Sequence, residues 1–193
     1  MRHKIKAAST FIKTLVKSPQ AIGAVMPSGK KLCRAMVKAI EADQNSIYVE
    51  VGAGTGVVTK ELIAAGIPPH NIYLFENEIN FIPKLKILFP DAHVIHGDVQ
   101  FLQKHLTALG VGKVSKIISS LPFKSLPQSV VNNILEQFDM VLKKDGKIVQ
   151  FTYSVNQPYS ETFKQQYGFE AEKQAYIPQN IPPATVWLYK RKP

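Results

Sequence analysis

The sequence has a single cysteine and no long hydrophobic run, and both shortages narrow what the chain can be. One cysteine among 193 residues excludes a disulfide within the chain, which fits a reducing cytoplasm. Cys33 stands beside Leu32 on a predicted helix face, and we interpret it as a small hydrophobic residue without a catalytic role. Lysines interrupt the N-terminal segment, which therefore predicts neither a signal peptide nor a transmembrane helix.

Acidic residues are missing from the first 40 positions. This segment carries nine Lys or Arg, whereas residues 41–193 carry fifteen basic and fourteen acidic residues. Almost the whole net charge of +10 therefore lies near the N-terminus. We expect such a segment to meet a polyanion, which is either an acidic membrane surface or nucleic acid.

The same segment has the pattern of a basic amphipathic helix over residues 1–18. Ile5, Ala8, Ile12 and Leu15 recur at spacings of three and four, with lysines largely on the other side. Such a helix can lie in a lipid interface. It can also dock its apolar stripe on the protein's own core, and the sequence leaves both interpretations open.

Strand-like and helix-like patterns alternate along the rest of the chain. This order predicts an α/β fold of βαβ units, a mostly parallel seven-stranded sheet with helices on both faces. The last two runs have no helix between them and predict an antiparallel terminal pair. We divide the chain into N-terminal helices, residues 1–45, and a core, residues 46–193. Strands are expected at 47–51, 72–75, 93–95, 114–119, 147–153, 169–177 and 184–189, and helices at 28–42, 55–65, 79–88, 99–109 and 128–142.

The stretch VEVGAGTGVVTKEL places three glycines between the first strand and the next helix. A strand-to-helix turn of this kind presents free backbone N–H groups to a ligand. A dinucleotide fingerprint would need a small residue at Val57, which the chain lacks. The pattern E-x-G-x-G-x-G instead resembles motif I of class I S-adenosylmethionine-dependent methyltransferases, which have a Rossmann-like sheet. That resemblance implies cofactor binding by Glu50, Gly52, Gly54, Thr55 and Gly56.

Acidic residues also follow the second and third strands. A carboxylate at Glu76 can accept hydrogen bonds from both ribose hydroxyls of a nucleoside. In the methyltransferase superfamily an aspartate placed like Asp98 accepts from the adenine amino group. Each residue also has a structural interpretation, a loop charge for Glu76 and a helix cap for Asp98. The signals at three successive strand ends together favour a methyltransferase, whose cofactor site would include Asn77, Gly97 and Val99.

Metal ligands are not expected in this sequence. It offers no cysteine–histidine pair, and His93 and His96 are three positions apart on a strand, so their side chains face opposite sides. We therefore predict a methyl transfer that needs no metal.

The fourth strand ends in SSLPF. In amino-methylating enzymes this position often carries N-P-P-Y or N-L-P-Y, and the aromatic ring stacks on the amino group. The match to Leu-Pro-aromatic favours a nitrogen acceptor, whereas the serine in place of asparagine argues against a planar nucleobase amine. The acceptor residues that this motif implies are Ser120, Leu121, Pro122 and Phe123.

Over residues 11–191 the chain resembles the short bacterial phospholipid N-methyltransferases, which use S-adenosylmethionine to methylate phosphatidylethanolamine toward phosphatidylcholine. The stretches GAVMPS, SSLPFKSLP and NIPPATVWLYKR carry this resemblance beside the glycine motif. It implies the same cofactor and a phospholipid amine as acceptor. Tyr153 and Asn180 are expected to bind the headgroup or orient its amine.

The resemblance further implies a peripheral enzyme at the inner face of the cytoplasmic membrane, with residues 1–18 lying on an anionic surface. Related rRNA adenine dimethyltransferases share the sheet and the Leu-Pro-aromatic motif but not the N-terminal stretch. An RNA methyltransferase is therefore the first alternative, although we expect nucleic acid less than lipid. A cofactor-binding module that has lost catalysis is the second alternative.

Overall fold

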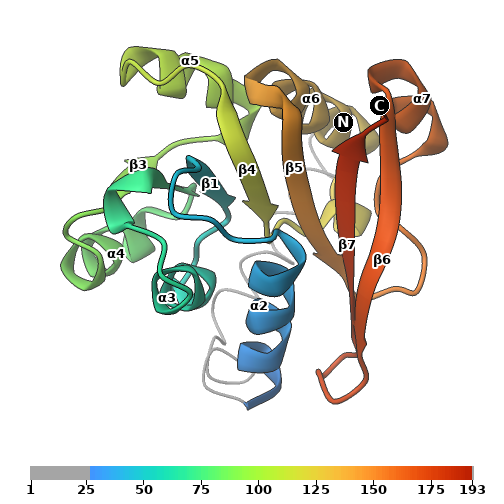
Figure 1. The fold of residues 1–193 in the computed structure, drawn as a ribbon, viewed down its shortest axis with the longest axis horizontal. Coiled ribbons are helices and arrows are strands. Elements are labelled where there is room, and N and C mark those ends of the chain that lie inside the picture. The colour runs from blue at the N-terminus through green and yellow to red at the C-terminus, as the bar shows by residue number, and fades with distance from the viewer. Residues whose placement is uncertain (1–26, 193) are drawn as a thin grey trace.

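The computed structural model describes residues 27–192, which form one sheet with helices on both of its faces (Figure 1). The sheet has seven strands in the order β3-β2-β1-β4-β5-β7-β6. Its strands are β1 Tyr48–Val51, β2 Ile72–Glu76, β3 His93–His96, β4 Val114–Ser119, β5 Leu142–Thr152, β6 Phe169–Ile177 and β7 Ala184–Arg191. The α-helices are α2 Pro27–Ala39, α3 Val57–Ala64, α4 Ile82–Leu88, α5 Leu102–Ala108, α6 Gln128–Val141 and α7 Glu161–Tyr167.

Strands β1 to β5 run parallel, and β7 lies antiparallel between β5 and β6. The predicted mixed sheet with an antiparallel terminal pair is therefore confirmed. From β1 the chain proceeds outward through β2 to β3, and from β4 it proceeds the other way to β5. The strand order reverses between β1 and β4, and open α/β sheets hold their ligands beside such a reversal, at the carboxyl ends of the strands.

Two hydrophobic clusters fill the two sides of the sheet. All four residues of β1 are buried, as expected for a central parallel strand that is covered on both faces. One cluster packs the sheet against α5, α6 and α7, with Leu102, Leu106, Ile134, Phe138 and Phe163 among its buried members. The other packs it against α2, α3 and α4 through Leu32, Met36, Ile40, Leu62 and Leu85.

A buried lysine fixes the C-terminal end of α2 to the sheet. The ammonium of Lys116 on β4 donates to the carbonyls of Ile40 and Glu41 at 3.0 and 3.2 Å, and it lies 3.7 Å from the Asp43 carboxylate. Burial lowers the pKa of this lysine. These bonds satisfy carbonyls that the helix end leaves free. They hold α2 so that its first turn reaches the carboxyl edge of the sheet.

The structure departs from the predicted elements in a few places. Helix α2 ends at Ala39 because the chain turns at Glu41, which has a φ of 53°. The helices predicted at 79–88 and 99–109 each begin as a 3₁₀ turn, Ile79–Phe81 and Val99–Phe101. Helix α7 was not predicted, although Ser160 caps it and Gly168 ends it in the left-handed conformation.

Two predictions on the N-terminal part stay untested. The amphipathic helix over residues 1–18 lies outside the described residues, and the boundary at residue 45 remains a prediction. None of the helices within residues 27–192 is long and apolar enough to cross a bilayer.

Candidate active site

Backbone hydrogen bonds align the loops that follow four neighbouring strands. The N–H of Gly97 donates to the carbonyl of Glu76 at 3.1 Å, and the N–H of Gly52 donates to Phe75 at 2.9 Å. The N–H of Ser120 donates to the carbonyl of Val51, also at 2.9 Å. The residues predicted after β1, β2, β3 and β4 are therefore brought together along one edge of the sheet, at the reversal of strand order.

The three glycines after β1 serve different purposes. Gly52, Gly54 and Gly56 have φ values of 74°, 53° and 76°, in the left-handed region that favours glycine. A Cβ on Gly56 would lie 2.3 Å from the ring of Phe89, so this glycine is required by packing within the protein. A Cβ on Gly54 would approach only the carbonyl oxygen of Gly52, at 4.0 Å, which leaves its outer side open to a ligand.

The carboxylate of Glu76 is held in place by the glycine turn. One oxygen accepts from the N–H of Gly54 at 2.8 Å, and the other accepts from the N–H of Glu78 at 2.7 Å. The side chain is only 9% exposed. Because a carboxylate offers about four lone-pair sites, each oxygen keeps one for a ligand hydroxyl. Its neighbour Asn77 is exposed.

Residues 97–99 form the next position along the edge. The Asp98 carboxylate accepts from the backbone N–H and the side-chain amide of Gln100, at 2.9 and 3.0 Å, and so caps the 3₁₀ turn. The helix-cap interpretation is thus correct, and it leaves lone pairs free for a ligand. A Cβ on Gly97 would lie 2.6 Å from the ring of His105, and the side chain of Val99 is buried in the core.

Glu50 lies beneath the glycine turn with a buried carboxyl group. Its exposed fraction is 1%, and one oxygen accepts from the Thr59 hydroxyl at 2.6 Å. The other oxygen has no hydrogen-bond partner among residues 27–192. Burial raises the pKa of Glu50 to about 8, and the nearby Glu76 charge adds to that effect. An unpartnered buried acceptor at this place fits a cationic group of a ligand.

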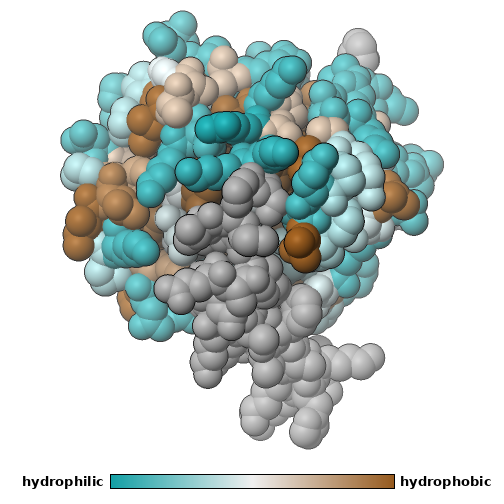
Figure 2. All heavy atoms as spheres, turned by 90° about the horizontal axis from the view of Figure 1, so that it is seen from below, coloured by the Kyte–Doolittle hydropathy of each residue, from teal (hydrophilic) through white to brown (hydrophobic). Residues whose placement is uncertain are grey.

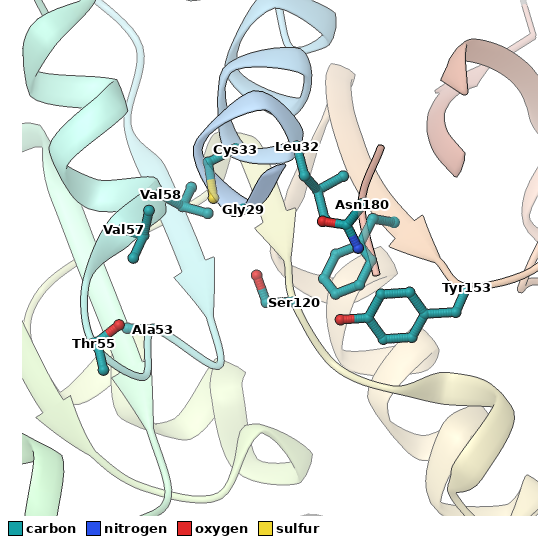
Figure 3. Close-up of a pocket in the computed structure, with 11 residues that line it drawn as sticks. Gly29, Leu32, Cys33, Ala53, Thr55, Val57, Val58, Ser120, Tyr153 and Asn180 are labelled. Atoms are coloured by element: carbon teal, nitrogen blue, oxygen red, sulfur yellow. The ribbon is translucent and has the colours of Figure 1, made fainter. Parts of the chain in front are cut away.

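A pocket of about 190 Å³ lies between the glycine turn and the ends of β4 and β5 (Figure 3). In Figure 3, Ser120 lies between the turn residues Ala53 and Thr55 on one side and Tyr153 on the other. Asn180 enters from the β6–β7 hairpin, and its amide donates to the carbonyl of Pro182. The structure therefore brings together three of the predicted acceptor residues. Apolar walls come from Leu32, Val57, Val58 and Phe151, and Gly29 and Cys33 complete the lining.

The prediction for Phe123 needs correction. Its ring is buried in the core, with centroid distances of 5.4 Å to Tyr159 and 6.3 Å to Phe138, and it does not line the pocket. Leu121 and Pro122 are half-buried and do not line the pocket either. The chain turns after Ser120 and directs the aromatic residue into the α6 side of the sheet, where burial of the ring is favourable. The aromatic residues at the pocket are Phe151 and Tyr153, whose rings meet edge to face at 5.3 Å.

Sequence reasoning missed Gln150. This residue of β5 is fully buried, and its amide donates to the carbonyls of Leu121 and Phe151 at 2.9 and 2.8 Å. It therefore positions the loop after β4 against the end of β5. Its signal is a polar residue within the apolar run Ile148–Phe151 of β5, which the sequence alone does not connect to the pocket.

Cys33 lines the pocket, which the sequence did not indicate. Burial raises the pKa of its thiol to about 12, so the thiol stays neutral at physiological pH. A neutral thiol is a poor nucleophile, and the prediction that Cys33 has no catalytic role stays a prediction. The two histidines predicted not to share a metal each contact a backbone carbonyl, His93 that of His70 and His96 that of Asn77, both at 3.2 Å.

Comparison with solved structures identifies the architecture. The chain aligns with the 1,6-didemethyltoxoflavin N1-methyltransferase of Burkholderia thailandensis, which was solved with S-adenosylhomocysteine. The TM-score is 0.72 at 12% identity, and the alignment covers 100% of this chain and 91% of that protein. The fold is that of the class I S-adenosylmethionine-dependent methyltransferases. The site described above lies at the carboxyl edge of this fold, beside the reversal of strand order.

Curated relatives are methyltransferases as well, although no protein-family model matches the chain. An ornithine lipid N-methyltransferase of Singulisphaera acidiphila is 28% identical over 183 residues, which cover 92% of this chain and 93% of the relative. A ribosomal RNA small subunit methyltransferase A of Thermotoga maritima is 23% identical over 98% of this chain and 69% of the relative. In its fold and its relatives the chain is similar to the methyltransferases of this class, and S-adenosylmethionine is the cofactor that these similarities indicate.

The residues of the carboxyl edge fit that cofactor. The Glu76 carboxylate has lone pairs for two ribose hydroxyls, and Asp98 has one for an amino group. Gly54 leaves open space where the backbone must come close to a ligand. The unpartnered oxygen of Glu50 suits the ammonium group of the amino-acid portion. Gly56 faces Phe89 and Gly52 faces Leu121, so both glycines are close to protein atoms rather than to open space.

Proposed function

We propose that the chain is a lipid N-methyltransferase that methylates the headgroup amine of a phospholipid, phosphatidylethanolamine toward phosphatidylcholine. The observation that carries this proposal is the chemistry of the pocket beside the glycine turn. Its polar side chains, those of Thr55, Ser120, Tyr153 and Asn180, are neutral, and most of the remaining wall is apolar. Support comes from the relative that is named as an ornithine lipid N-methyltransferase and matches nearly full length.

The cofactor, when bound, supplies an activated methyl group, so the protein has to align the acceptor and keep water out. In the proposed arrangement Glu76, Asp98 and Glu50 hold the cofactor. The acceptor amine then lies near Ser120, which stands between the glycine turn and Tyr153. The hydroxyl oxygens of Ser120 and Tyr153 and the amide oxygen of Asn180 can accept hydrogen bonds from an amine.

The acceptor must lose a proton before it can attack. A primary ammonium has a pKa of about 10.4, like that of lysine, and is largely protonated at neutral pH. The apolar wall of Leu32, Val57, Val58 and Phe151 disfavours the charged form and lowers that pKa. Burial also raises the pKa of the Tyr153 phenol, which therefore stays neutral and acts as a hydrogen-bonding group. Because desolvation lowers this pKa, the amine gives its proton to bulk water as it enters the pocket, and the neutral amine then attacks the methyl group.

An RNA methyltransferase is the second candidate, because several curated relatives are ribosomal RNA methyltransferases. Two observations favour the lipid. Serine stands at position 120, where recognition of a planar base amine wants an asparagine, and the Phe123 ring is buried rather than free to stack on a base. A protein that binds the cofactor without transferring its methyl group is the third possibility.

A lipid acceptor implies work at a membrane surface. We propose that the protein acts at the inner face of the cytoplasmic membrane, and that residues 1–18 lie on the anionic leaflet. Nine basic residues and no acidic residue within positions 1–40 support this arrangement.

An acceptor panel tests the proposed function. The full-length protein is incubated with methyl-labelled cofactor and one of three acceptors: phosphatidylethanolamine vesicles, vesicles that contain ornithine lipid, or structured ribosomal RNA. We expect label in the phosphatidylethanolamine fraction. Label in ornithine lipid alone would show that the acceptor is a lipid with a different headgroup. Label in RNA would contradict the proposal and favour an RNA methyltransferase. Cofactor binding without any label would indicate the inactive module.

A further inference from the structure

Four exposed hydrophobic side chains lie on the two segments that contribute Tyr153 and Asn180 to the pocket. Tyr153 and Val155, which follow β5, are 42% and 61% exposed, and Tyr176 and Ile181 of the β6–β7 hairpin are 48% and 69% exposed. Tyr153 itself lines the pocket, and Ile181 directly follows the lining residue Asn180. Soluble surfaces carry single exposed apolar residues as a rule, but a group at a substrate entrance calls for a partner.

The strand register places the two segments at the same end of the sheet. Thr152, the last residue of β5, pairs with Thr185 of β7, and Thr185 pairs with Tyr176 of β6. The loop after β5 and the tip of the hairpin therefore emerge side by side. A third segment joins them, because the ammonium of Lys124 donates to the hydroxyl of Ser154 at 3.2 Å. We name segments 120–127, 153–160 and 176–184 the docking rim.

Charge separates the docking rim from the rest of the edge. Its three segments contain no Asp or Glu, whereas the loops on the cofactor side carry Glu76, Glu78 and Asp98. Lys124 is exposed within the rim, and the Lys173 ammonium lies 5.5 Å from the ring centre of Tyr176 beside it. Figure 2 shows the molecule from below, the side toward which β4 and β5 run in Figure 1, and hydrophobic patches are exposed there among hydrophilic ones.

We propose that the docking rim is a membrane contact that seats the pocket on the surface of an anionic bilayer. Tyrosine favours the headgroup level, short apolar side chains such as Val155 and Ile181 reach into the acyl boundary, and lysine meets lipid phosphates. Seated in this way, the pocket opens toward the headgroups, so that a lipid amine reaches Ser120 while its acyl chains stay in the bilayer. The inference rests on the proposed lipid substrate, and it is separate from the role of residues 1–18.

Vesicle co-sedimentation of the full-length protein tests this contact. The vesicles contain phosphatidylethanolamine and phosphatidylglycerol at about three to one, which gives an anionic surface. The variant Val155→Asp/Ile181→Asp is compared with Ile87→Asp/Leu109→Asp, which changes two exposed residues of α4 and the α5 end. We expect the rim variant to bind vesicles about five- to tenfold more weakly, because anionic lipid repels carboxylates at an inserted position. The control variant should bind like the parent.

Two further readouts separate this inference from the proposed function. The rim variant should keep the parent's cofactor affinity and its rate on a short-chain, monomeric phosphatidylethanolamine, while its rate on vesicles falls. If the parent methylates lipid but the rim variant binds vesicles normally, the docking rim is wrong and the function stands. If the parent labels RNA and the rim variant loses RNA binding, the docking rim binds nucleic acid, and both proposals fail.

A second variant covers the case in which the two carboxylates unfold the protein. In Ile181→Trp, the added tryptophan should shift its emission to the blue on vesicle addition and be quenched by brominated lipid, whereas Ile87→Trp should show neither change. Equal responses of the two tryptophans, or none at position 181, would overturn the proposal.

Discussion

The two halves of the carboxyl edge are built from different chemistry. The half at β1, β2 and β3 carries Glu50, Glu76 and Asp98, and each carboxyl group accepts a hydrogen bond from the protein. The half at β4, β5 and the β6–β7 hairpin has no carboxylate, and its pocket residues are neutral or apolar. The first half is fixed in advance for a polar ligand with known hydroxyl and amino positions, and the second offers an apolar entrance.

This difference explains why enzymes with different acceptors can share the cofactor half of the site but not the acceptor half. Any enzyme with the same cofactor needs similar acceptors at the same strand ends, and the first half supplies them. The acceptor differs between enzymes, and here Ser120, Tyr153 and the docking rim determine what enters. The comparison therefore predicts that changes in the two halves have separable effects.

The largest expected effect comes from the glycine turn itself. In Gly56→Ala the new methyl group lies 2.3 Å from the Phe89 ring. The alanine must also adopt the φ of 76° that Gly56 has. We expect a loss of about 2–5 kcal/mol in the free energy of unfolding, from left-handed strain together with overpacking. Gly110→Ala is the matched control, because its φ is 70° and nothing lies within 4 Å of the new atom. Urea denaturation should show only about 1–2 kcal/mol there, and equal losses would contradict the packing role of Gly56.

The next effect concerns the cofactor half. Glu76→Ala removes the acceptor that the N–H groups of Gly54 and Glu78 hold in place. The free energy of cofactor binding measured by calorimetry should weaken by about 1–3 kcal/mol, which lowers the affinity roughly five- to 150-fold. Glu78→Ala serves as the control, since the side chain of Glu78 accepts only from Asn80, and should leave the affinity nearly unchanged. An unchanged affinity in Glu76→Ala would contradict the assignment of this carboxylate as the acceptor for the ribose hydroxyls.

Counted per pH unit, a smaller effect is expected from pH through Glu50. Its folded pKa of about 8 lies above the unfolded value of about 4.3, so the cofactor-free folded state binds this proton more tightly. The stabilising contribution is fully present below about pH 4.3 and is lost as pH rises toward about 8, with a slope of at most about 1.4 kcal/mol per unit. Glu50→Gln should flatten that part of the stability curve, measured by thermal melts at several pH values without cofactor.

Cofactor binding should show the opposite dependence. An ammonium group beside Glu50 favours the ionised carboxyl group, so affinity should rise as pH approaches 8. The same pH slope for affinity in Glu50→Gln and in the parent would show that another group is responsible.

The sequence predicted the cofactor half more fully than the acceptor half. Glycines and carboxylates at strand ends are local signals, because the position of each residue follows from the strand that precedes it. The burial of Phe123 depends on contacts with Phe138 and Tyr159, which lie far along the chain, and no local pattern reveals it. Gln150 escaped prediction for the same reason, since its role depends on the carbonyl of Leu121 on another loop.

The secondary structure was likewise predictable where the signal is local. The strands were located within a few residues because their apolar runs are short and bounded by turn residues, except that β5 begins at Leu142, five residues before its predicted start. The first turns of the helices after β2 and β3 tighten into 3₁₀ geometry, because Glu78 and Asp98 accept from N–H groups two residues on. Helix α7 has a cap at Ser160 and a stop at Gly168, but its seven residues are too few for a clear helical period.

The measurement that tests the account most directly is a crossed comparison of two single variants, Glu76→Ala and Tyr153→Phe. For each, cofactor affinity is measured by calorimetry and the KM for phosphatidylethanolamine vesicles by labelled methyl transfer. We predict that Glu76→Ala weakens the cofactor alone, and that Tyr153→Phe raises the lipid KM severalfold, through loss of a hydrogen bond worth about 1 kcal/mol, with cofactor affinity unchanged. A parent that transfers no methyl group to lipid, or a Tyr153→Phe variant that loses cofactor and keeps its lipid KM, would contradict the account.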